Sequence, residues 1–239
     1  MKEADMNIII DKADSRGHAN HGWLNTSHTF SFADYYNPQR MHFGALRVLN
    51  DDTVIPRSGF DTHPHKNMEV VSIPLKGCLR HGDSLENSHI IEPGQIQVMS
   101  AGSGIYHSEY NASSDENLEF LQIWVIPDQT DTPPRYADYD IRPLLKHNEI
   151  STFIAPGTAI ALRQQAWFSW AELDRGTTCT YRLKGKQTGV YIFVIEGSIA
   201  IDETEALLDR RDGAGITDID ALTVTARKPS TILLIEVAL

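Results

Sequence analysis

The sequence has few cysteines and no long apolar run. Only Cys78 and Cys179 occur in 239 residues, too few for the disulfide framework of a small secreted domain. The longest apolar stretches, such as TILLIEVAL, have the length of a strand and fall far short of the roughly 20 residues that span a bilayer. The opening segment MKEADMNIII mixes acidic and basic residues and shows no signal-peptide pattern. These absences predict a cytoplasmic protein with no membrane partner.

Positive charge is also scarce. Lysine and arginine together number 21, against 32 aspartates and glutamates, which gives a net charge of -11. Sequence-independent binding to nucleic-acid phosphates needs clustered positive charge, so we expect no direct nucleic-acid partner. The charge balance leaves open a protein partner.

Helical patterns are weak, and strand patterns dominate. The best candidate for a short helix or turn is the segment PRYADYDIRPLLKH. Many other short segments are rich in β-branched and aromatic residues and end at Gly, Pro or Asn. They include FGALRVLN, MEVVSIPLKG, QIQVMSAG, LEFLQIWVIP, GVYIFVIEGSIAI, ALTVTA and TILLIEVAL. Regularly spaced short strands of this kind predict an all-β fold of the sandwich or barrel type.

The chain divides near its middle. The stretch 127–136, PDQTDTPPRY, has the polar, proline-rich composition of a linker. On both sides of it, a strand, a Gly turn, a strand, a loop and a second Gly turn recur with nearly the same separation, from Gly77 to Gly94 and from Gly197 to Gly213. This echo predicts two tandem β domains, 1–132 and 133–239.

Two pairs of metal-ligating residues occur in the first half. His63 and His65 stand at i and i+2, so an extended backbone sends both side chains to one face, and His107 and Glu109 repeat this spacing. On neighbouring strands, the two pairs could direct four donors to one spot. Three imidazoles and a carboxylate suit a divalent ion such as Fe, Mn, Co, Ni or Cu, with positions left for substrate or oxygen. A single His-x-His beside a loop is more often polar surface, and the second pair is what favours a metal site.

Other histidines carry less information. His18, His21 and His28 lie close together, but their spacing fits no common metal site. His81 and His89 occupy a polar, hairpin-like stretch and are expected to be solvated.

The second half lacks metal-binding equipment. Beyond Glu109 the remaining histidine is His147, which lies outside the strand pattern. We therefore predict a single metal site, in the first domain, and a second domain without metal ligands. Trp124 alternates with polar neighbours and is expected to lie in the core of the first barrel.

Several of these segments occur together and in the same order in a known family. HPHKNMEVVSIPLKG resembles the first cupin motif, and GSGIYHSEYN resembles the second. Together with HGWLNTSHTFSFADYY and GALRVLNDD, they make the first half of the chain resemble the pirin family, whereas the second half resembles it in length and strand pattern alone. Gly59, close to His63, and Gly102, in place of a proline, depart from the general cupin motifs but are shared by pirin-like sequences.

The resemblance implies a bicupin, that is, two tandem jelly-roll-like β-barrels with one mononuclear metal site in the first. The implied ligands are His63, His65, His107 and Glu109, and the implied metal is iron. In the wider cupin superfamily the glutamate of the first motif, here Glu69, is commonly a ligand. On a regular strand it would share the face of His63 and His65. The pirin pattern favours Glu109, and Glu69 stays as the alternative.

Two functions follow from the resemblance. Bacterial pirin-like proteins resemble quercetin 2,3-dioxygenases, which open a flavonol with O2 and release carbon monoxide. In that case the ligands are a small aromatic substrate and O2, and Glu109 is both a metal ligand and the catalytic base for the flavonol hydroxyl. The alternative is a pirin-type, redox-responsive, metal-binding regulatory protein that acts through protein partners. A pocket at the metal, large enough for a flavonol, would distinguish the enzyme.

Overall fold

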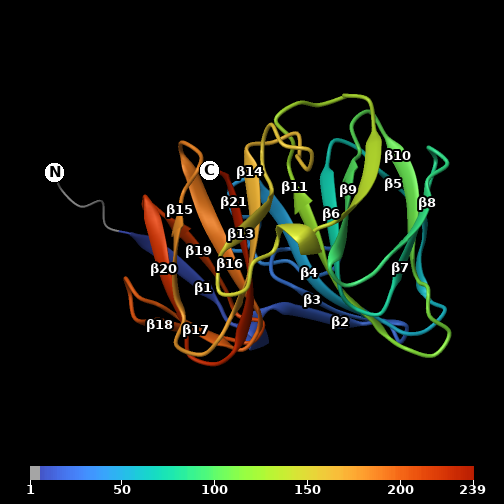
Figure 1. Cartoon of the computed structure of the whole chain (residues 1–239). Helices are drawn as coiled ribbons and strands as arrows, with labels where there is room; N and C mark the ends of the chain where they lie inside the picture. The colour runs from blue at the N-terminus through green and yellow to red at the C-terminus, as the bar shows by residue number, and fades with distance from the viewer. Residues whose placement is uncertain (1–5) are drawn as a thin grey trace. The chain divides into compact units, whose positions relative to one another are not determined.

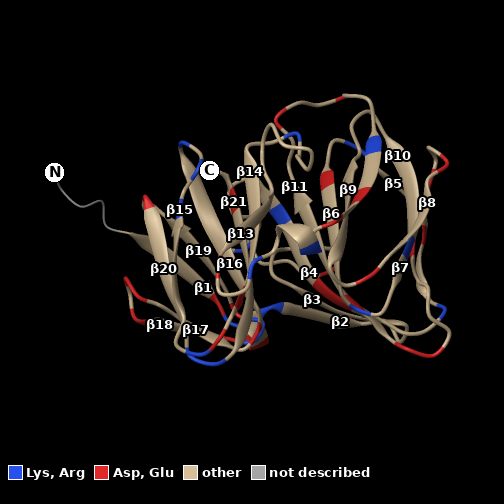
Figure 2. Ribbon diagram, in the orientation of Figure 1, with Lys and Arg blue, Asp and Glu red and all other residues tan. Residues whose placement is uncertain are grey.

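The computed structural model describes residues 6–239, which form β-strands and two single-turn 3-10 helices, η1 (Ala13–Ser15) and η2 (Arg142–Leu144) (Figure 1). The prediction of an all-β fold is confirmed. No helix within the described part of the chain is long and apolar enough to cross a membrane. Lys and Arg are interleaved with Asp and Glu along loops and strand ends (Figure 2).

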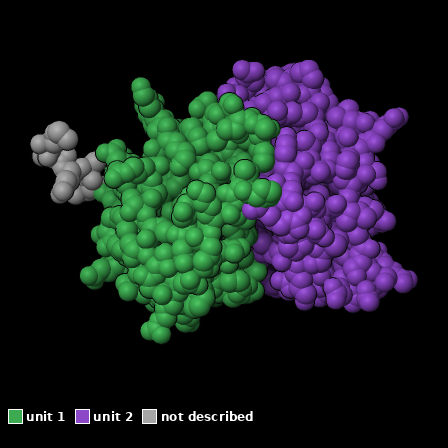
Figure 3. Space-filling model, viewed as in Figure 1, with its two compact units in different colours: residues 1–16, 143–161, 165–239 green, residues 17–142, 162–164 purple. Residues whose placement is uncertain are grey.

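The chain divides into two compact units (Figure 3). Unit 2 comprises residues 17–142 and 162–164, and unit 1 comprises the described residues up to Arg16 together with 143–161 and 165–239. The predicted boundary between residues 132 and 133 lies just before strand β12 (Arg135–Asp140), which pairs with β9 (Gln95–Ser100) in unit 2. Strand β1 (Asn7–Asp11) pairs instead with β19 (Gly213–Thr217) in unit 1. Strand pairing thus places each of these strands in a unit made mostly of residues from the other side of the predicted boundary.

Unit 2 is built from two antiparallel sheets. The seven-stranded sheet has, in spatial order, β12, β9, β6 (Glu69–Lys76), β11 (Leu118–Val125), β4 (Leu46–Val54), β3 (Leu24–His28) and β2 (Gly17–Asn20). The four-stranded sheet has the order β5 (Gly59–His65), β10 (Ile105–Asn111), β7 (Leu79–Asp83) and β8 (Ser88–Ile91). Leu24, Val54 and Phe120 of the first sheet pack with Leu79 and Ile91 of the second, so the two sheets face each other across a common core.

Unit 1 repeats this arrangement. Its six-stranded sheet has the order β1, β19, β16 (Thr188–Glu196), β21 (Ser230–Ala238), β14 (Ala166–Leu173) and β13 (Ser151–Ile154). Its four-stranded sheet has the order β15 (Thr178–Arg182), β20 (Ala221–Ala226), β17 (Ser198–Ile201) and β18 (Ala206–Asp209). One apolar cluster takes side chains from both sheets, among them Val190, Leu234, Ile199 and Val224.

The repeated Gly turns are equivalent in the two units. Gly77 joins β6 to β7 with φ of 75°, and Gly197 joins β16 to β17 with φ of 89°. A Cβ atom at Gly77 would lie 2.8 Å from the carbonyl oxygen of Asn117, and one at Gly197 would lie 2.2 Å from that of Pro229. Positive φ and close backbone contact both require glycine here, which explains the echo in the sequence.

The prediction of a short helix or turn for PRYADYDIRPLLKH is wrong over residues 135–140 of that segment. Residues 135–140 form β12, and the helical part is limited to η2. Tyrosine, present here as Tyr136 and Tyr139, is a residue type that favours strands, and the free edge of β9 offers backbone partners along its whole length.

Candidate metal centre

The two predicted ligand pairs lie on adjacent strands of the four-stranded sheet. His63 and His65 are on β5, and β5 pairs with β10 so that His63 faces His107 directly. Strand β5 is at the edge of its sheet, where the missing N–H of Pro64 removes no hydrogen bond to a second neighbour. A register shift between His107 and Glu109 sets Glu109 opposite Phe60.

The three histidines converge on one point. Their donor nitrogens all lie within 4.8 Å of one another. The Nε2 atoms of His63 and His65 are 3.1 Å apart, and the His107 ring centroid lies 4.5 Å and 4.8 Å from those of His63 and His65. His63 Nδ1 donates to the carbonyl oxygen of Asp61 at 2.7 Å, which leaves the lone pair of the neutral ring on Nε2, the atom that faces the other histidines.

The electrostatics of the cluster favour neutral imidazoles, the form that binds metals. Burial, together with the positive charge that His107 and His63 would carry, lowers the pKa of His65 to about 3. Burial also lowers the pKa of His107 to about 3, with His63 and His81 adding to the effect. Within the described residues neither ring nitrogen of His107 has a hydrogen-bond partner, although its side chain is 1% exposed. A buried imidazole without a partner is costly, and a divalent transition metal would satisfy it.

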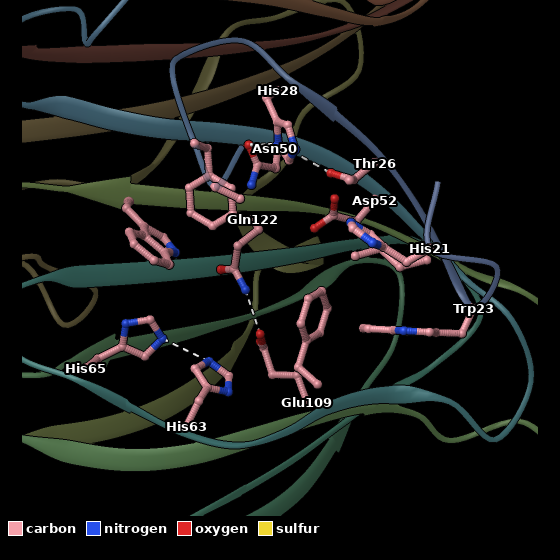
Figure 4. Close-up of a pocket in the computed structure, with 15 residues that line it drawn as sticks. His21, Trp23, Thr26, His28, Asn50, Asp52, His63, His65, Glu109 and Gln122 are labelled. Carbon is pink, nitrogen blue, oxygen red and sulfur yellow. Dashed lines mark hydrogen bonds between the residues drawn. The ribbon is translucent and has the colours of Figure 1, made fainter. Parts of the chain in front are cut away.

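Glu109 is a buried carboxylate on the same strand as His107. Its Oε1 accepts hydrogen bonds from Ser72 Oγ at 2.7 Å and from Gln97 Nε2, and its Oε2 accepts one from Gln122 Nε2 at 2.6 Å (Figure 4). Glu109 lines the same pocket as His63 and His65, beside the cluster of three histidine nitrogens rather than within it. Three donors from the seven-stranded sheet therefore fix this carboxylate next to the histidines.

Glu69 lies elsewhere. The chain turns at Asn67, which has φ of 50°, and Glu69 then begins β6 in the seven-stranded sheet, so it does not continue the face of His63 and His65. Its carboxylate accepts hydrogen bonds from Ser100 Oγ at 2.7 Å and from the backbone N–H of Arg163 at 3.1 Å. Glu69 is buried, but it does not line the pocket.

A cavity of about 380 Å³ opens beside the histidines, a volume within the range of small-molecule sites. Aromatic and aliphatic side chains form much of its wall, namely those of Trp23, Leu24, Phe32, Phe60 and Trp124. The polar residues that line it besides the candidate ligands are His21, Thr26, His28, Asn50, Asp52 and Gln122. Trp124, expected in the barrel core, is thus a pocket wall, and its ring packs edge-on against His65 at 4.9 Å.

Comparison with known proteins decides the family. The profile described as Pirin matches residues 10–125, and the profile described as Quercetinase C-terminal cupin domain matches residues 155–237. A quercetin 2,3-dioxygenase of Escherichia coli is 39% identical over 230 residues, which cover 96% of this chain and 98% of that protein. This chain belongs to the pirin family. A pirin-like protein of Caulobacter vibrioides is 38% identical over 239 residues, covering 96% of this chain and all of the relative.

Solved pirin structures support the same conclusion. The bacterial pirin YhhW of E. coli, crystallised in complex with nickel(II), superposes with a TM-score of 0.91 at 36% identity and covers 97% of this chain and 99% of its own. The prediction of a bicupin is therefore confirmed, with a pirin domain followed by a quercetinase-type cupin domain.

Sequence reasoning missed two residues near the site of this pirin. His81, expected to be solvated, is 1% exposed, and its Nε2 donates to Asp83 at 2.9 Å. Its ring stacks on Tyr136 at 4.0 Å and lies 5.4 Å from that of His107. The i, i+2 spacing of His81 and Asp83 repeats that of the candidate ligands and could have indicated a buried pair. His89, by contrast, is exposed as expected.

Asp52 is the second missed residue. It is 3% exposed and lines the pocket from β4. Burial raises its pKa to about 7 against the opposing effect of a hydrogen bond from Thr26, with smaller contributions from the charges of Asp51 and Glu109. The signal was present in the segment LRVLNDDTV, where acidic residues interrupt an apolar strand.

Proposed function

We propose that this pirin is a metal-dependent dioxygenase that opens a flavonol such as quercetin with O2. The observation that carries the proposal is the convergence of three imidazole side chains, two of which line a cavity of about 380 Å³ with aromatic sides. The names of the relatives at about 40% identity support the same reaction class.

The residues present fit a metal ion. His63, His65 and His107 would hold it through ring nitrogens, and Glu109 would be the fourth ligand. A divalent transition metal would supply a Lewis-acidic, redox-active centre at which a flavonol and O2 can react. We propose iron as the metal in the native protein, although the donor set also suits Mn, Co, Ni and Cu.

The chain's own groups prepare the substrate. The walls formed by Trp23, Phe60 and Trp124 bury a flat aromatic body and exclude water from it. Glu109 would accept the proton of the flavonol hydroxyl at a carboxylate oxygen. Gln122 holds that carboxylate from the pocket side and Gln97 from behind, so a proton shift at Glu109 requires little movement of the site.

Oxygen uptake on addition of quercetin tests the proposal. Metal-stripped protein is loaded separately with each of the five metals, and His63→Ala and His107→Ala variants are run beside the exposed-histidine control His147→Ala. We expect uptake that depends on the metal, disappears in the first two variants and persists in the control. Tight metal binding without uptake for any metal would rule out this reaction and favour the regulatory alternative.

A further inference from the structure

We propose that Asp52 and its neighbours Thr26, His28 and Asn50 form a second binding subsite, which holds a substrate hydroxyl remote from the metal centre. This subsite would make the protein selective for polyhydroxylated aromatic substrates over otherwise identical ones without the remote hydroxyls. The inference rests on the proposed function, which it deepens by naming the substrate class.

The subsite lies across the pocket from the metal ligands. Thr26 faces Asp52 in the pairing of β3 with β4, and His28 faces Asn50 two residues further along, on the same face of the sheet. Figure 4 shows these four side chains on one side of the pocket and His63 and His65 on the other, with Gln122 between them and Glu109 on the side of His63. A ligand that reaches the metal centre therefore presents its far end to β3 and β4.

Asp52 carries an unused acceptor. Its Oδ1 is buried and has no hydrogen-bond partner in the described part of the chain. The neighbouring acceptor, Asn50 Oδ1, is already taken by His28 Nδ1 at 2.9 Å. Buried polar atoms are nearly always paired in folded proteins, so an unpaired acceptor in a pocket wall indicates that a ligand supplies the missing donor.

The charge environment selects the kind of ligand. Burial raises the pKa of Asp52 to about 7, and the negative charges of Asp51 and Glu109 add to this effect, although a hydrogen bond from Thr26 opposes it. This surrounding disfavours a carboxylate or phosphate on the ligand. A phenolic hydroxyl suits it, because it donates to an ionised carboxylate and accepts from a protonated one.

The space between the two polar ends suits an aromatic ring system. Trp23 and Phe60 meet edge-to-face with ring centroids 5.1 Å apart, and both line the cavity with Leu24 and Phe32. A flat body with a metal-binding hydroxyl at one end and further hydroxyls at the other matches this order of polar, apolar and polar surfaces.

Binding without turnover tests the subsite. Metal-loaded full-length protein is titrated under argon with quercetin and with 3-hydroxyflavone, which has the same ring system without the remote hydroxyls, and tryptophan fluorescence gives each Kd. We expect quercetin to bind about tenfold more tightly than 3-hydroxyflavone, the value of one hydrogen bond to a charged group. Asp52→Leu should bring the two Kd values close together, mainly by weakening the binding of quercetin.

Two further variants keep the result interpretable. Asp52→Asn preserves shape and should reduce the ratio to about threefold, since an amide oxygen is the weaker acceptor. Asp51→Asn changes the same charge on the adjacent residue, which does not line the pocket, and should keep the wild-type ratio. The subsite is overturned if both Asp52 variants keep that ratio, or if the wild type shows none. A retained ratio under argon with no oxygen uptake in air would instead refute the dioxygenase and leave the subsite in place.

Discussion

The two barrels have equivalent strand orders, apart from the additional strand β2 in unit 2, and differ in what fills them. In both, a four-stranded sheet packs on a larger one, and the Gly77 and Gly197 turns fix equivalent positions. Asn111 faces Leu79, two residues after Gly77, and Ala226 faces Ile199, two residues after Gly197. Counted from these points, Glu109 corresponds to Val224 and His107 to Leu222. His63 pairs with His107 as Tyr181 pairs with Leu222.

The polar side chains that hold Glu109 in the first barrel also have apolar counterparts in the second barrel. In the first barrel they are side chains of three adjacent strands, Ser72, Gln97 and Gln122. By the same count, their counterparts in the second barrel are Ile192, Ala214 and Leu234. All three counterparts, together with Leu222 and Val224, belong to one buried apolar cluster. The barrel is therefore a scaffold, and seven or so interior side chains decide whether it carries a metal site.

Two sets of buried polar groups, one in each unit, differ in how they are paired. In unit 1, Glu236 is fully buried but accepts hydrogen bonds from the Tyr181 and Thr188 hydroxyls and the backbone N–H groups of Lys184 and Gly185. In unit 2, His107 and Asp52 keep buried atoms without partners among the described residues. The paired carboxylate of Glu236 serves the fold, whereas the unpaired atoms of His107 and Asp52 lie where a ligand is expected.

The largest effect on stability is expected where burial is satisfied. Glu236→Leu should lower the free energy of unfolding by about 3 kcal/mol or more, because it leaves four donors without an acceptor. Urea denaturation measures the change. The exposed Glu172→Leu, in the same sheet, should stay within about 0.5 kcal/mol of wild type. An equally small change in the free energy of unfolding for Glu236→Leu would show that the hydrogen bonds of this buried carboxylate do not stabilise the fold.

The pH dependence of stability should single out Asp52. Its pKa is raised to about 7 in the folded state from 3.8, so the folded protein retains a proton that the unfolded chain releases, and stability falls as the pH rises through this window. From pH 5 to pH 8, metal-free wild type should lose about 3 kcal/mol relative to Asp52→Asn, which cannot ionise. Denaturation curves of both proteins across this range provide the test, and parallel curves would show that Asp52 ionises normally.

The hydrogen bonds to Glu109 should affect metal affinity. Gln122→Leu installs the residue found at the equivalent position of the second barrel and removes a donor to Glu109 Oε2. We expect about tenfold weaker metal binding, as for other groups that orient ligands. Competition with a chromophoric chelator measures the affinity, with the exposed Gln39→Leu as control. An unchanged metal affinity in Gln122→Leu would show that the support of Glu109 does not contribute to metal binding.

The smallest expected effect is a gain in stability. His107→Leu converts this position to the residue of the second barrel and removes two buried nitrogens that lack partners. The metal-free variant should be about 1 kcal/mol more stable than metal-free wild type in urea, while it no longer binds metal. A loss of stability would mean that His107 serves the fold of the barrel rather than a ligand.

The sequence predicted the fold class, the duplication and the pairing of the two ligand motifs, because alternation and Gly turns are local signals. It did not predict the pocket. His81 and Asp52 look like surface residues in a linear reading, since their burial depends on which face of a strand meets the opposite sheet. The place of Glu69 depended on the turn at Asn67, which has a positive φ in a residue other than glycine. The sequence also did not predict which unit contains β1 and which contains β12, because their placement depends on pairing with strands distant in the sequence.

Metal stoichiometry tests whether the three histidines of the first barrel hold a single ion. Stripped protein is dialysed against Ni²⁺ under argon, and the metal and protein contents are then measured together for wild type, for His63→Ala, His65→Ala and His107→Ala, and for the control His147→Ala. We expect one ion per chain in the wild type and the control, and none in the three variants of the first barrel. A second ion in the wild type, or one ion retained in His107→Ala, would contradict this expectation.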